Sequence, residues 1–306
     1  IEFNKDGTKM FTSFGFDLKD PADDYHYLNE YNLSTPYDIS TRTYAGASER
    51  CELGSGSNGV DTHNNAVVYD LEFSSDGMKI FVTSRQAGTD ADHDKVYRFD
   101  LTTAYDISTC AYVQETSNLD DADNLNGSNA GNFTGALNNN RLQGIEINND
   151  GTKLFLLWKG TDTRLLEFTL TTPYDLTTMT LVTNAGIDVT SVSNPASMRF
   201  SLNGKRIFII DHNENDALVT QISLTNAYDT SSFNLDGSVD INDLTPSNNE
   251  PRGIAFNASG LKIYIGNDRN QNSADQIMEY NLVCPFNIIA GKCPSIAENS
   301  DRTGMA

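Results

Sequence analysis

IEFNKDGTKMF, residues 1–11, is the first of five copies of one phrase. The other copies are LEFSSDGMKIF at 71–81, IEINNDGTKLF at 145–155, MRFSLNGKRIF at 198–208 and IAFNASGLKIY at 254–264. A second phrase follows each copy at a variable distance: STPYDIST at 34–41, TTAYDIST at 102–109, TTPYDLTT at 171–178, TNAYDTSS at 225–232 and VCPFNIIA at 283–290. Two phrases that keep their order through five copies indicate an array of five similar supersecondary units.

Each unit is predicted to consist of β-strands. In the first phrase, two strand-like segments flank an Asp-Gly or Asn-Gly pair, which is the strongest short-range signal for a β-hairpin. These pairs are Asp6-Gly7, Asp76-Gly77, Asp150-Gly151 and Asn203-Gly204, with Ser259-Gly260 as a weaker copy. A third strand leads into the second phrase, a fourth follows it, and no stretch has helical periodicity. The pattern predicts an all-β fold, a β-propeller of five four-stranded antiparallel blades.

We expect one propeller domain over residues 1–297. Its repeats fall at about 1–66, 67–141, 142–194, 195–250 and 251–297, and residues 298–306 form a linker or tail. The chain opens directly on a strand-like segment, so we expect it to be part of a longer protein.

The first phrase also carries a family resemblance. Its core, seen as Phe73, Asp76, Gly77 and Lys79 in the second copy, resembles the YVTN-type propeller repeats of bacterial and archaeal surface proteins. The longer form with PYDIST is similar to repeats in uncharacterised surface or fibre proteins of marine bacteria and their phages. This resemblance covers almost the whole chain. It implies a propeller in a surface protein, but propeller repeats serve as lectins, scaffolds, lactonases and adhesins alike.

The composition is strongly acidic and excludes some function classes. The chain has 42 Asp and Glu against 21 Lys and Arg, a formal net charge of −21. Binding of nucleic acid through phosphate neutralisation needs a basic surface, and docking on anionic membranes needs basic clusters. No apolar run approaches the roughly 18 residues that a membrane-spanning helix requires. We therefore expect neither nucleic-acid partners nor membrane insertion.

The recurring Tyr-Asp pairs are interpreted as structural turns. They occur as Tyr37-Asp38, Tyr105-Asp106, Tyr174-Asp175 and Tyr228-Asp229. A catalytic pair is needed once, whereas a structural turn is needed in every blade. We predict that the Asp caps backbone amides of the turn and that the Tyr packs on the neighbouring blade.

The variable segments are predicted to share the face opposite the two turns. They comprise loops near 13–27, 84–95, 158–164, 211–217 and 266–275, and crossings near 51–66 and 114–141. Variable loops on a regular scaffold usually carry binding residues. Trp158, His93 and His212 are therefore candidate ligand-binding residues, Trp158 as a ring that stacks on a sugar. The alternatives are core packing for Trp158 and plain solvation for the acidic loops.

Calcium is the candidate cofactor, because hard cations prefer clustered carboxylate and amide oxygens. The candidate ligands are Asp120, Asp121, Asp123 and Asn124 in one crossing and Asp90, Asp92 and Asp94 in one loop. Residues 232–243 also have the spacing of a twelve-residue calcium loop, although they fall where a fourth strand should lie and a plain Asp-Gly turn is the alternative. The histidines lack HxH or HxxxH spacing, which argues against a transition-metal site.

Three inner strands carry an acid at the same repeat position. Glu2, Glu72 and Glu146 precede the anchor residue of their repeats, whereas the fourth and fifth repeats have Arg199 and Ala255 there. Because side chains alternate along a strand, these residues face away from the blade core, toward a shared surface or the central channel. A structural ion-pair network is one interpretation. A carboxylate pair for hydrolysis is the other.

The four cysteines favour an oxidising, exported setting. Cys284 and Cys293 bracket the last turn at a spacing that suits a disulfide, and Cys51 could pair with Cys110, although the register looks poor. Our leading hypothesis is a non-enzymatic extracellular module on a cell or virion surface, for adhesion, recognition or assembly through the acidic variable face. Its partners would be a surface protein or glycan, or neighbouring copies. The alternatives are a propeller hydrolase or lactonase with carboxylates and metal near the axis, and an architectural subunit of a filament, sheath or surface layer.

Overall fold

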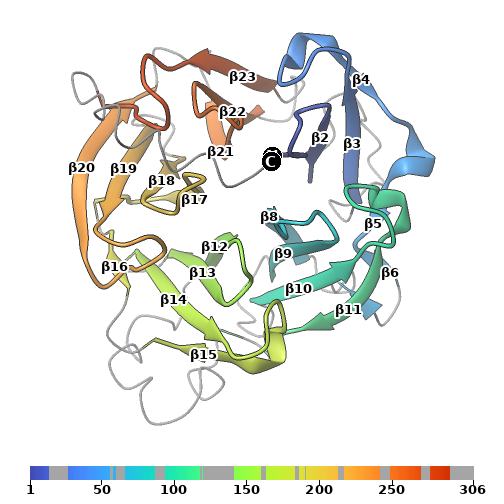
Figure 1. Ribbon diagram of the computed structural model, residues 1–306, viewed down its shortest axis with the longest axis horizontal. Helices are drawn as coiled ribbons and strands as arrows, with labels where there is room; N and C mark the ends of the chain where they lie inside the picture. Colours follow the sequence, from blue (N-terminus) through green and yellow to red (C-terminus); the bar gives the residue numbers. More distant parts are fainter. Residues whose placement is uncertain are drawn as a thin grey trace.

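The predicted five-bladed propeller is confirmed. In the computed structural model, five antiparallel sheets surround a central axis in chain order (Figure 1). The structure describes residues 1–13, 27–55, 58–59, 66–86, 94–117, 119, 141–159, 163–182, 186–189, 191–212, 217–241, 249–269 and 276–289.

The strands run outward from the axis in sequence order within each blade. Blade 1 holds β1 (Glu2–Phe3), β2 (Lys9–Thr12), β3 (Tyr27–Leu33) and β4 (Arg42–Tyr44), with β5 (Cys51–Glu52) also paired to β3. Blade 2 holds β8 (Ala66–Phe73), β9 (Lys79–Gln86), β10 (Lys95–Asp100) and β11 (Ala111–Glu115). Blade 3 holds β12 (Arg141–Ile147), β13 (Lys153–Lys159), β14 (Arg164–Leu170) and β15 (Met179–Leu181), with β16 (Ile187–Asp188) also paired to β14. Blade 4 holds β17 (Pro195–Phe200), β18 (Arg206–Asp211), β19 (Leu218–Leu224) and β20 (Phe233–Asp240).

Blade 5 has three strands within the described residues: β21 (Asn249–Phe256), β22 (Lys262–Arg269) and β23 (Gln276–Asn281). The sequence predicts a fourth strand over 288–297. Of that segment, Ile288 and Ile289 are described and lie outside any strand, and the other residues lie outside the described part of the chain. Ile288 donates its N–H to Gln221 of blade 4.

Short elements complete the structure. A small ribbon pairs β6 (Gly54–Ser55) with β7 (Asn58–Gly59), and one-turn 3₁₀ segments are η1 (Ile39–Thr41), η2 (Ala47–Glu49), η4 (Ile107–Thr109) and η6 (Leu176–Thr178). Among the described elements, no helix has the length and apolarity that a membrane crossing requires.

The candidate calcium loop at 232–243 is not a loop in the part that the structure describes, because residues 233–240 form β20. The side chain of Asp236, which would be the ligand at position 5 of such a loop, instead accepts hydrogen bonds from Gln221 and Ser223 of the neighbouring strand. Gly237 has a φ of +140° at a register shift, so it allows a bulge in this outer strand. The segment is therefore the fourth strand of blade 4.

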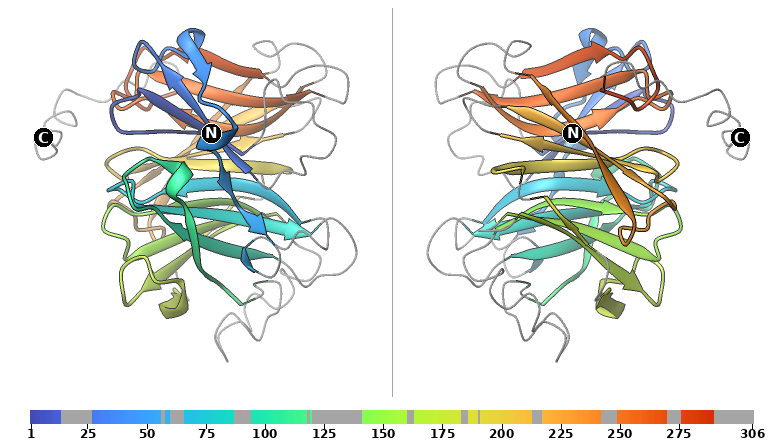
Figure 2. Two further views of the ribbon diagram at one scale, coloured as in Figure 1. Left: turned by 90° about the vertical axis from the view of Figure 1, so that its right-hand side faces the viewer. Right: turned by 90° about the vertical axis from the view of Figure 1, so that its left-hand side faces the viewer.

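The two predicted turns of each repeat contact one another. The aromatic residue of every second phrase has a left-handed φ, between +49° and +63°, and its N–H donates to the carbonyl of the glycine in the hairpin turn of its own blade. The pairs are Tyr37 with Gly7, Tyr105 with Gly77, Tyr174 with Gly151, Tyr228 with Gly204 and Phe286 with Gly260. In the side views of Figure 2 these turns gather on one face of the disc, which we name the turn face.

The predicted roles of the Tyr-Asp pair are confirmed. The carboxylate of Asp38 accepts from the backbone N–H of Ser40, and Asp175 accepts from Thr177 in the same way. The ring of Tyr105 lies 5.2 Å from Phe73 of its own blade and 6.4 Å from Phe11 of the preceding blade, measured between centroids. The phrase therefore caps a turn and fills the junction between two blades.

The hydrophobic core is divided among the five junctions between blades. Each buried cluster combines residues of two adjacent blades, as where Phe155 of blade 3 lies 4.7 Å from Phe200 of blade 4. The same packing closes the ring, because Tyr264 of blade 5 lies 4.6 Å from Phe3 of blade 1, beside the buried Ile1. We name this last junction the closing seam.

Cys51 and Cys110 form a disulfide between blade 1 and the start of the outer strand of blade 2, with 5.7 Å between their Cα atoms. The poor register expected for this pair does not prevent the bond, because Cys51 lies on β5, outside the regular outer strand. Cys284 is also disulfide-bonded. Its predicted partner, Cys293, lies outside the described residues.

Replacing both Cys51 and Cys110 with serine is expected to destabilise the fold. The disulfide joins residues separated by 59 positions, and closing a loop of that size in the unfolded chain is worth about 4 kcal/mol. Urea unfolding of the double variant and of the oxidised protein measures this loss. Equal free energies of unfolding would contradict the prediction.

Candidate functional site: a polar cluster on the propeller axis

The innermost strands bring their charged residues together on the axis. The anchor residues, such as Phe73 and Phe200, are buried between blades. Because side chains alternate along a strand, the residue before each anchor points to the opposite side, toward the axis. These residues are Glu2 of β1, Glu72 of β8, Glu146 of β12, Arg199 of β17 and Ala255 of β21.

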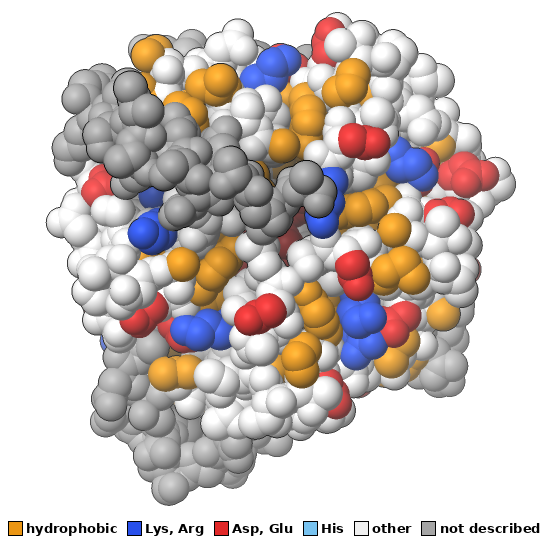
Figure 3. All heavy atoms as spheres, viewed as in Figure 1, with side chains coloured by type: hydrophobic (Ala, Val, Ile, Leu, Met, Phe, Trp, Pro, Cys, Tyr) orange, Lys and Arg blue, Asp and Glu red, His pale blue; other side chains and the backbone are white. Residues whose placement is uncertain are grey.

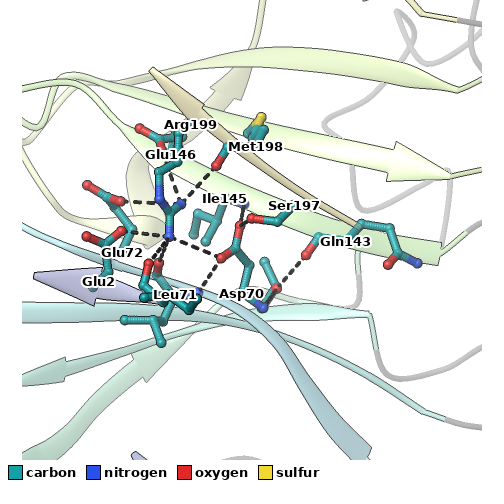
Figure 4. A network of polar contacts seen from close by, with 12 residues as sticks. Glu2, Asp70, Leu71, Glu72, Gln143, Ile145, Glu146, Ser197, Met198 and Arg199 are labelled. Carbon is teal, nitrogen blue, oxygen red and sulfur yellow. Dashed lines mark hydrogen bonds and ion pairs between the residues drawn. The ribbon is translucent and has the colours of Figure 1, made fainter. Parts of the chain in front are cut away.

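Arg199 lies at the centre of this cluster, within reach of four carboxyl groups (Figure 4). Its guanidinium nitrogens lie 2.6 Å from Glu2, 3.1 Å from Glu146, 3.3 Å from Asp70 and 3.8 Å from Glu72. The arginine side chain is 7% exposed, so these ion pairs are shielded from solvent. One side chain of blade 4 thus contacts acids of blades 1, 2 and 3.

The same guanidinium donates to backbone carbonyls. It bonds to the carbonyl of Met198 at 2.9 Å, of Leu71 at 3.0 Å and of Ile1 at 3.2 Å. Arginine presents five N–H donors in a rigid fork, which suits several fixed acceptors better than lysine does. Arg199 therefore links the inner strands through both backbone and side chains.

Asp70 is a member of the cluster that the sequence does not single out. It lies on β8, where the pairing with β9 shifts register between Val68 and Asp70. Its carboxylate also accepts from Ser197 Oγ at 3.0 Å and from the backbone N–H of Ile145 at 3.3 Å. The equivalent residues of blades 3 and 4 are Gly144 and Ser197. No repeated acid marks the position.

Electrostatics in the cluster favour protonated carboxyls. Burial, reinforced by the charges of Glu146 and Glu2, raises the pKa of Glu72 well above its usual 4.5. Burial also raises the pKa of Glu146 to about 8, against the opposing effect of Arg199. Burial alone would lower the pKa of Arg199, but the surrounding carboxylates outweigh it and raise that pKa well above its usual value. The guanidinium is therefore the fixed charge of the cluster.

This arrangement confirms the interpretation of Glu2, Glu72, Glu146 and Arg199 as a structural ion-pair network. Hydrolysis by a carboxylate pair requires the two acids to flank a substrate bond. Here the guanidinium occupies the space between the acids. Within the described part of the chain, no group of three or more His, Cys, Asp or Glu residues has the geometry to hold a metal ion.

A second charged device joins neighbouring blades near the turn face. In each case a cation donates to the carbonyl of the left-handed aromatic residue in the next blade. The links are Lys9 to Tyr105 at 3.0 Å, Arg98 to Tyr174 at 3.0 Å, Lys153 to Tyr228 at 2.6 Å, Arg206 to Phe286 at 3.4 Å and Lys262 to Tyr37 at 3.3 Å. The last of these crosses the closing seam.

The lysines of these links are held by acids of the third strand of their own blade. Lys9 pairs with Glu30 at 2.8 Å and Lys153 with Glu167 at 2.6 Å, and both carboxylates are about 4% exposed. Burial raises the pKa of Glu30, and its contact with Lys9 opposes that shift. The lysine recurs in the first phrase, and this repetition was the signal in the sequence that it has a role in each blade. Its acceptor, a carbonyl in another blade, is visible only in three dimensions.

The prediction that Trp158 stacks on a sugar is wrong in this structure. The side chain is 1% exposed and packs among apolar residues of blades 2 and 3. The alternative, that it is a packing residue, is confirmed. Trp158 belongs to β13, a strand that is flanked on both sides by blade cores.

The structure places two other predicted residues. His212 follows β18, and its ring contacts the side-chain amide of Asn194. Asp94 is 6% exposed and accepts from the backbone N–H of Leu142 at 3.0 Å, which anchors blade 2 to blade 3. The remaining candidates, His93, Asp90, Asp92, Asp120, Asp121, Asp123 and Asn124, lie outside the described residues.

The turn face is a mosaic of charges (Figure 3). Acidic and basic side chains alternate around it, and an acidic side chain lies at the floor of a hollow near its centre. Glu2 and Glu72 are the more accessible acids of the cluster, each 16% exposed. These two acids are therefore accessible from the turn face. The side chain of Arg199 is more deeply buried than they are.

Comparisons with known proteins return propellers of different functions. No family model and no curated protein matches the chain. A periplasmic gluconolactonase from Pseudomonas aeruginosa is 14% identical with a TM-score of 0.47, over 91% of this chain and 66% of that one. A GH43 β-1,3-galactosidase is 7% identical with a TM-score of 0.49, over 83% and 81%. The propeller domain of Cps50 from Myceliophteria thermophila is 10% identical with a TM-score of 0.42, over 92% and 81%.

These likenesses carry no argument about activity, because all three TM-scores are below 0.5 and all identities are at most 14%. The chain also spans only 65% to 66% of the length of the gluconolactonase structures it matches.

Proposed function

We propose that this chain is a non-enzymatic recognition module of an exported surface or fibre protein, related to the repeats it resembles in sequence. The observation that carries the proposal is the arrangement of the charged side chains on the propeller axis. Propeller enzymes of the glycosidase type need free carboxylates there, whereas here Arg199 occupies the centre and contacts all four acids. The inner strands thus serve cohesion, and the site of binding lies elsewhere.

Two further features support an exported binding role. The disulfide between Cys51 and Cys110 suits an oxidising environment, as found outside the cytosol. The turn face repeats the same structural contacts in each blade, so the variable segments, which the sequence predicts on the opposite face, are the parts free to differ. We propose these acidic segments as the recognition surface for a glycan or protein, with calcium as a cofactor bound by 118–129.

The direct test measures binding and hydrolysis on the same preparation. We expect the labelled protein to bind members of an immobilised glycan array or intact bacterial cells. Binding should be stronger when calcium is present at about 2 mM, because extracellular modules typically bind calcium with roughly millimolar affinity. We expect no hydrolysis of gluconolactone or of aryl glycosides above the buffer rate. The triple variant Asp120→Asn, Asp121→Asn, Asp123→Asn should lose at least half of the bound signal. The exposed control Glu52→Gln should retain it.

Two outcomes would replace the proposal. Hydrolysis that is abolished by Glu146→Gln would favour the propeller hydrolase, because that residue would then be reactive despite its contact with Arg199. Self-association without glycan or cell binding would favour an architectural subunit. The feature that suits such assembly is β20, an outer strand on which Phe233 and Leu235 are 44% and 50% exposed.

A further inference from the structure

The charges of the axial cluster do not balance. Four carboxyl groups and one guanidinium meet at the axis: Glu2 from β1, Asp70 and Glu72 from β8, Glu146 from β12 and Arg199 from β17. The fifth inner strand, β21, contributes Ala255, which has no charge. If every carboxyl were ionised, the acids would outnumber the cations in a shielded space.

An excess of buried like charge is costly, and a carboxyl can remove it by taking a proton. Asp70 is fixed in place by two backbone N–H groups, of Leu71 and Ile145, which donate to its oxygens. Glu72 and Glu146 lie beside it in the same buried space, and burial raises the pKa of both carboxyls. The extra proton is therefore assigned to Glu72 and Glu146.

The cluster also lies where the ring closes. Arg199 of blade 4 reaches Glu2 of β1 at 2.6 Å and the carbonyl of Ile1, the residue before that strand, at 3.2 Å. That strand forms one side of the closing seam, where Ile1 and Phe3 pack against Tyr264. Repulsion among the axial acids therefore acts on the junction that holds the first blade to the last.

We infer that the axial cluster is a pH-sensitive latch: the ring is held most tightly while the axial glutamates hold a proton, and it loosens as the pH rises from mildly acidic to mildly alkaline values and that proton is lost.

The direction of the effect follows from the shifted groups. Burial raises the pKa of Glu72 well above 4.5 and that of Glu146 to about 8. A carboxyl whose folded pKa exceeds its unfolded pKa binds its proton more tightly in the folded state. Its stabilising contribution is complete below about pH 4.5 and is lost as the pH rises through the folded value. For Glu146 the loss falls between about pH 4.5 and 8.

Other groups must be separated from this effect. The exposed Asp38 and Asp229 have lowered pKa values because Ser40 and Ser231 donate to them, so they destabilise the fold only on acidification below about pH 4. Burial raises the pKa of Glu30 and of Asp211, so their contributions to stability change with pH in the same direction as that of the latch. The pH dependence of the whole protein is therefore compared with that of axial variants.

The experiment is thermal unfolding from pH 5 to 8.5 for the intact chain, Glu72→Gln, Glu146→Gln and the exposed control Glu52→Gln. Glutamine mimics the protonated acid and cannot lose its proton. We expect the melting temperature of the unaltered protein and of the control to fall by roughly 5 °C or more across this range. In at least one axial variant, the decrease in melting temperature over this pH range should be no more than half as large. Equal slopes in all four proteins would overturn the latch.

A second measurement does not depend on how the variants fold. Because the folded state holds the extra proton, unfolding of the unaltered protein at pH 7 should release protons to the solvent. Calorimetry in phosphate and in Tris, which differ in ionisation enthalpy, detects this release as a difference in unfolding enthalpy. Proton uptake, or no exchange, would overturn the inference regardless of the variants.

Discussion

Arg199→Met is expected to lower the free energy of unfolding at pH 7 by about 3–5 kcal/mol, the typical cost of removing one partner from a buried ion pair. The arginine contacts four carboxyl groups and three backbone carbonyls, so its loss leaves several buried acceptors without their donor. Urea unfolding can be followed through Trp158, the single tryptophan, which is buried in the core.

The matched control is Arg42→Met. Arg42 is exposed, and its guanidinium donates to the carbonyl of Ile39 in the adjacent turn. A surface change of this kind is expected to stay within about 0.5 kcal/mol. Arg199→Lys should fall between the two, because it keeps the charge but not the planar fork. The deficit of Arg199→Met should shrink at pH 5, where the uncompensated acids take up protons. Equal stability of Arg199→Met and Arg42→Met would contradict the role of the cluster.

The sequence predicted the fold well because the signal is repeated. Each hairpin turn and each Tyr-Asp pair occurs in several copies, so one ambiguous copy, such as Ser259-Gly260, does not change the interpretation. The axial acids were found for the same reason. Glu2, Glu72 and Glu146 stand beside an anchor whose orientation is fixed by the blade core, and strand alternation then places them on the axis.

Features that occur once were missed. Asp70 lies two residues before Glu72 and so on the same side of its strand, but the equivalent positions in blades 3 and 4 hold Gly144 and Ser197, so no repeated acid marked it. Trp158 was assigned to a binding surface from its position near the end of a strand, but packing between blades buries it. Position along a strand does not reveal whether the next blade covers a side chain. That coverage depends on the tilt and spacing of the blades, which the repeat does not encode locally.

The hydrogen-bond acceptors of the recurring lysines could not be predicted from the sequence either. Lys9, Lys153 and Lys262 recur in the first phrase, yet their acceptors are carbonyls in the neighbouring blade. The short distance results from closing the ring, which brings residues such as Lys262 and Tyr37 together across the whole chain. A linear pattern can show that a residue is needed in every unit. It cannot show what that residue touches.

Gly77→Ala is expected to destabilise the protein by more than about 3 kcal/mol, because two separate costs add. Gly77 has a φ of +71°, a left-handed conformation that costs an L-residue roughly 1–2 kcal/mol. In addition, a Cβ there would lie 2.2 Å from Cε2 of Tyr105, far inside van der Waals contact. The aromatic ring of Tyr105 has no room to move, because it is packed against Phe73 and Phe11 at the junction of blades 1 and 2.

Gly46→Ala separates the two costs. Gly46 also has a positive φ, +116°, but the nearest atom to an added Cβ is 3.9 Å away, so only the backbone cost applies. We expect this control to lose about 1–3 kcal/mol, less than Gly77→Ala loses. Combining Gly77→Ala with Tyr105→Ala should cost less than the sum of the two single changes, because the double variant has no clash. Urea unfolding of the four proteins completes the cycle. If Gly77→Ala costs no more than Gly46→Ala, or if the double variant is additive, then the contact between glycine and tyrosine is not what locks the two turns together.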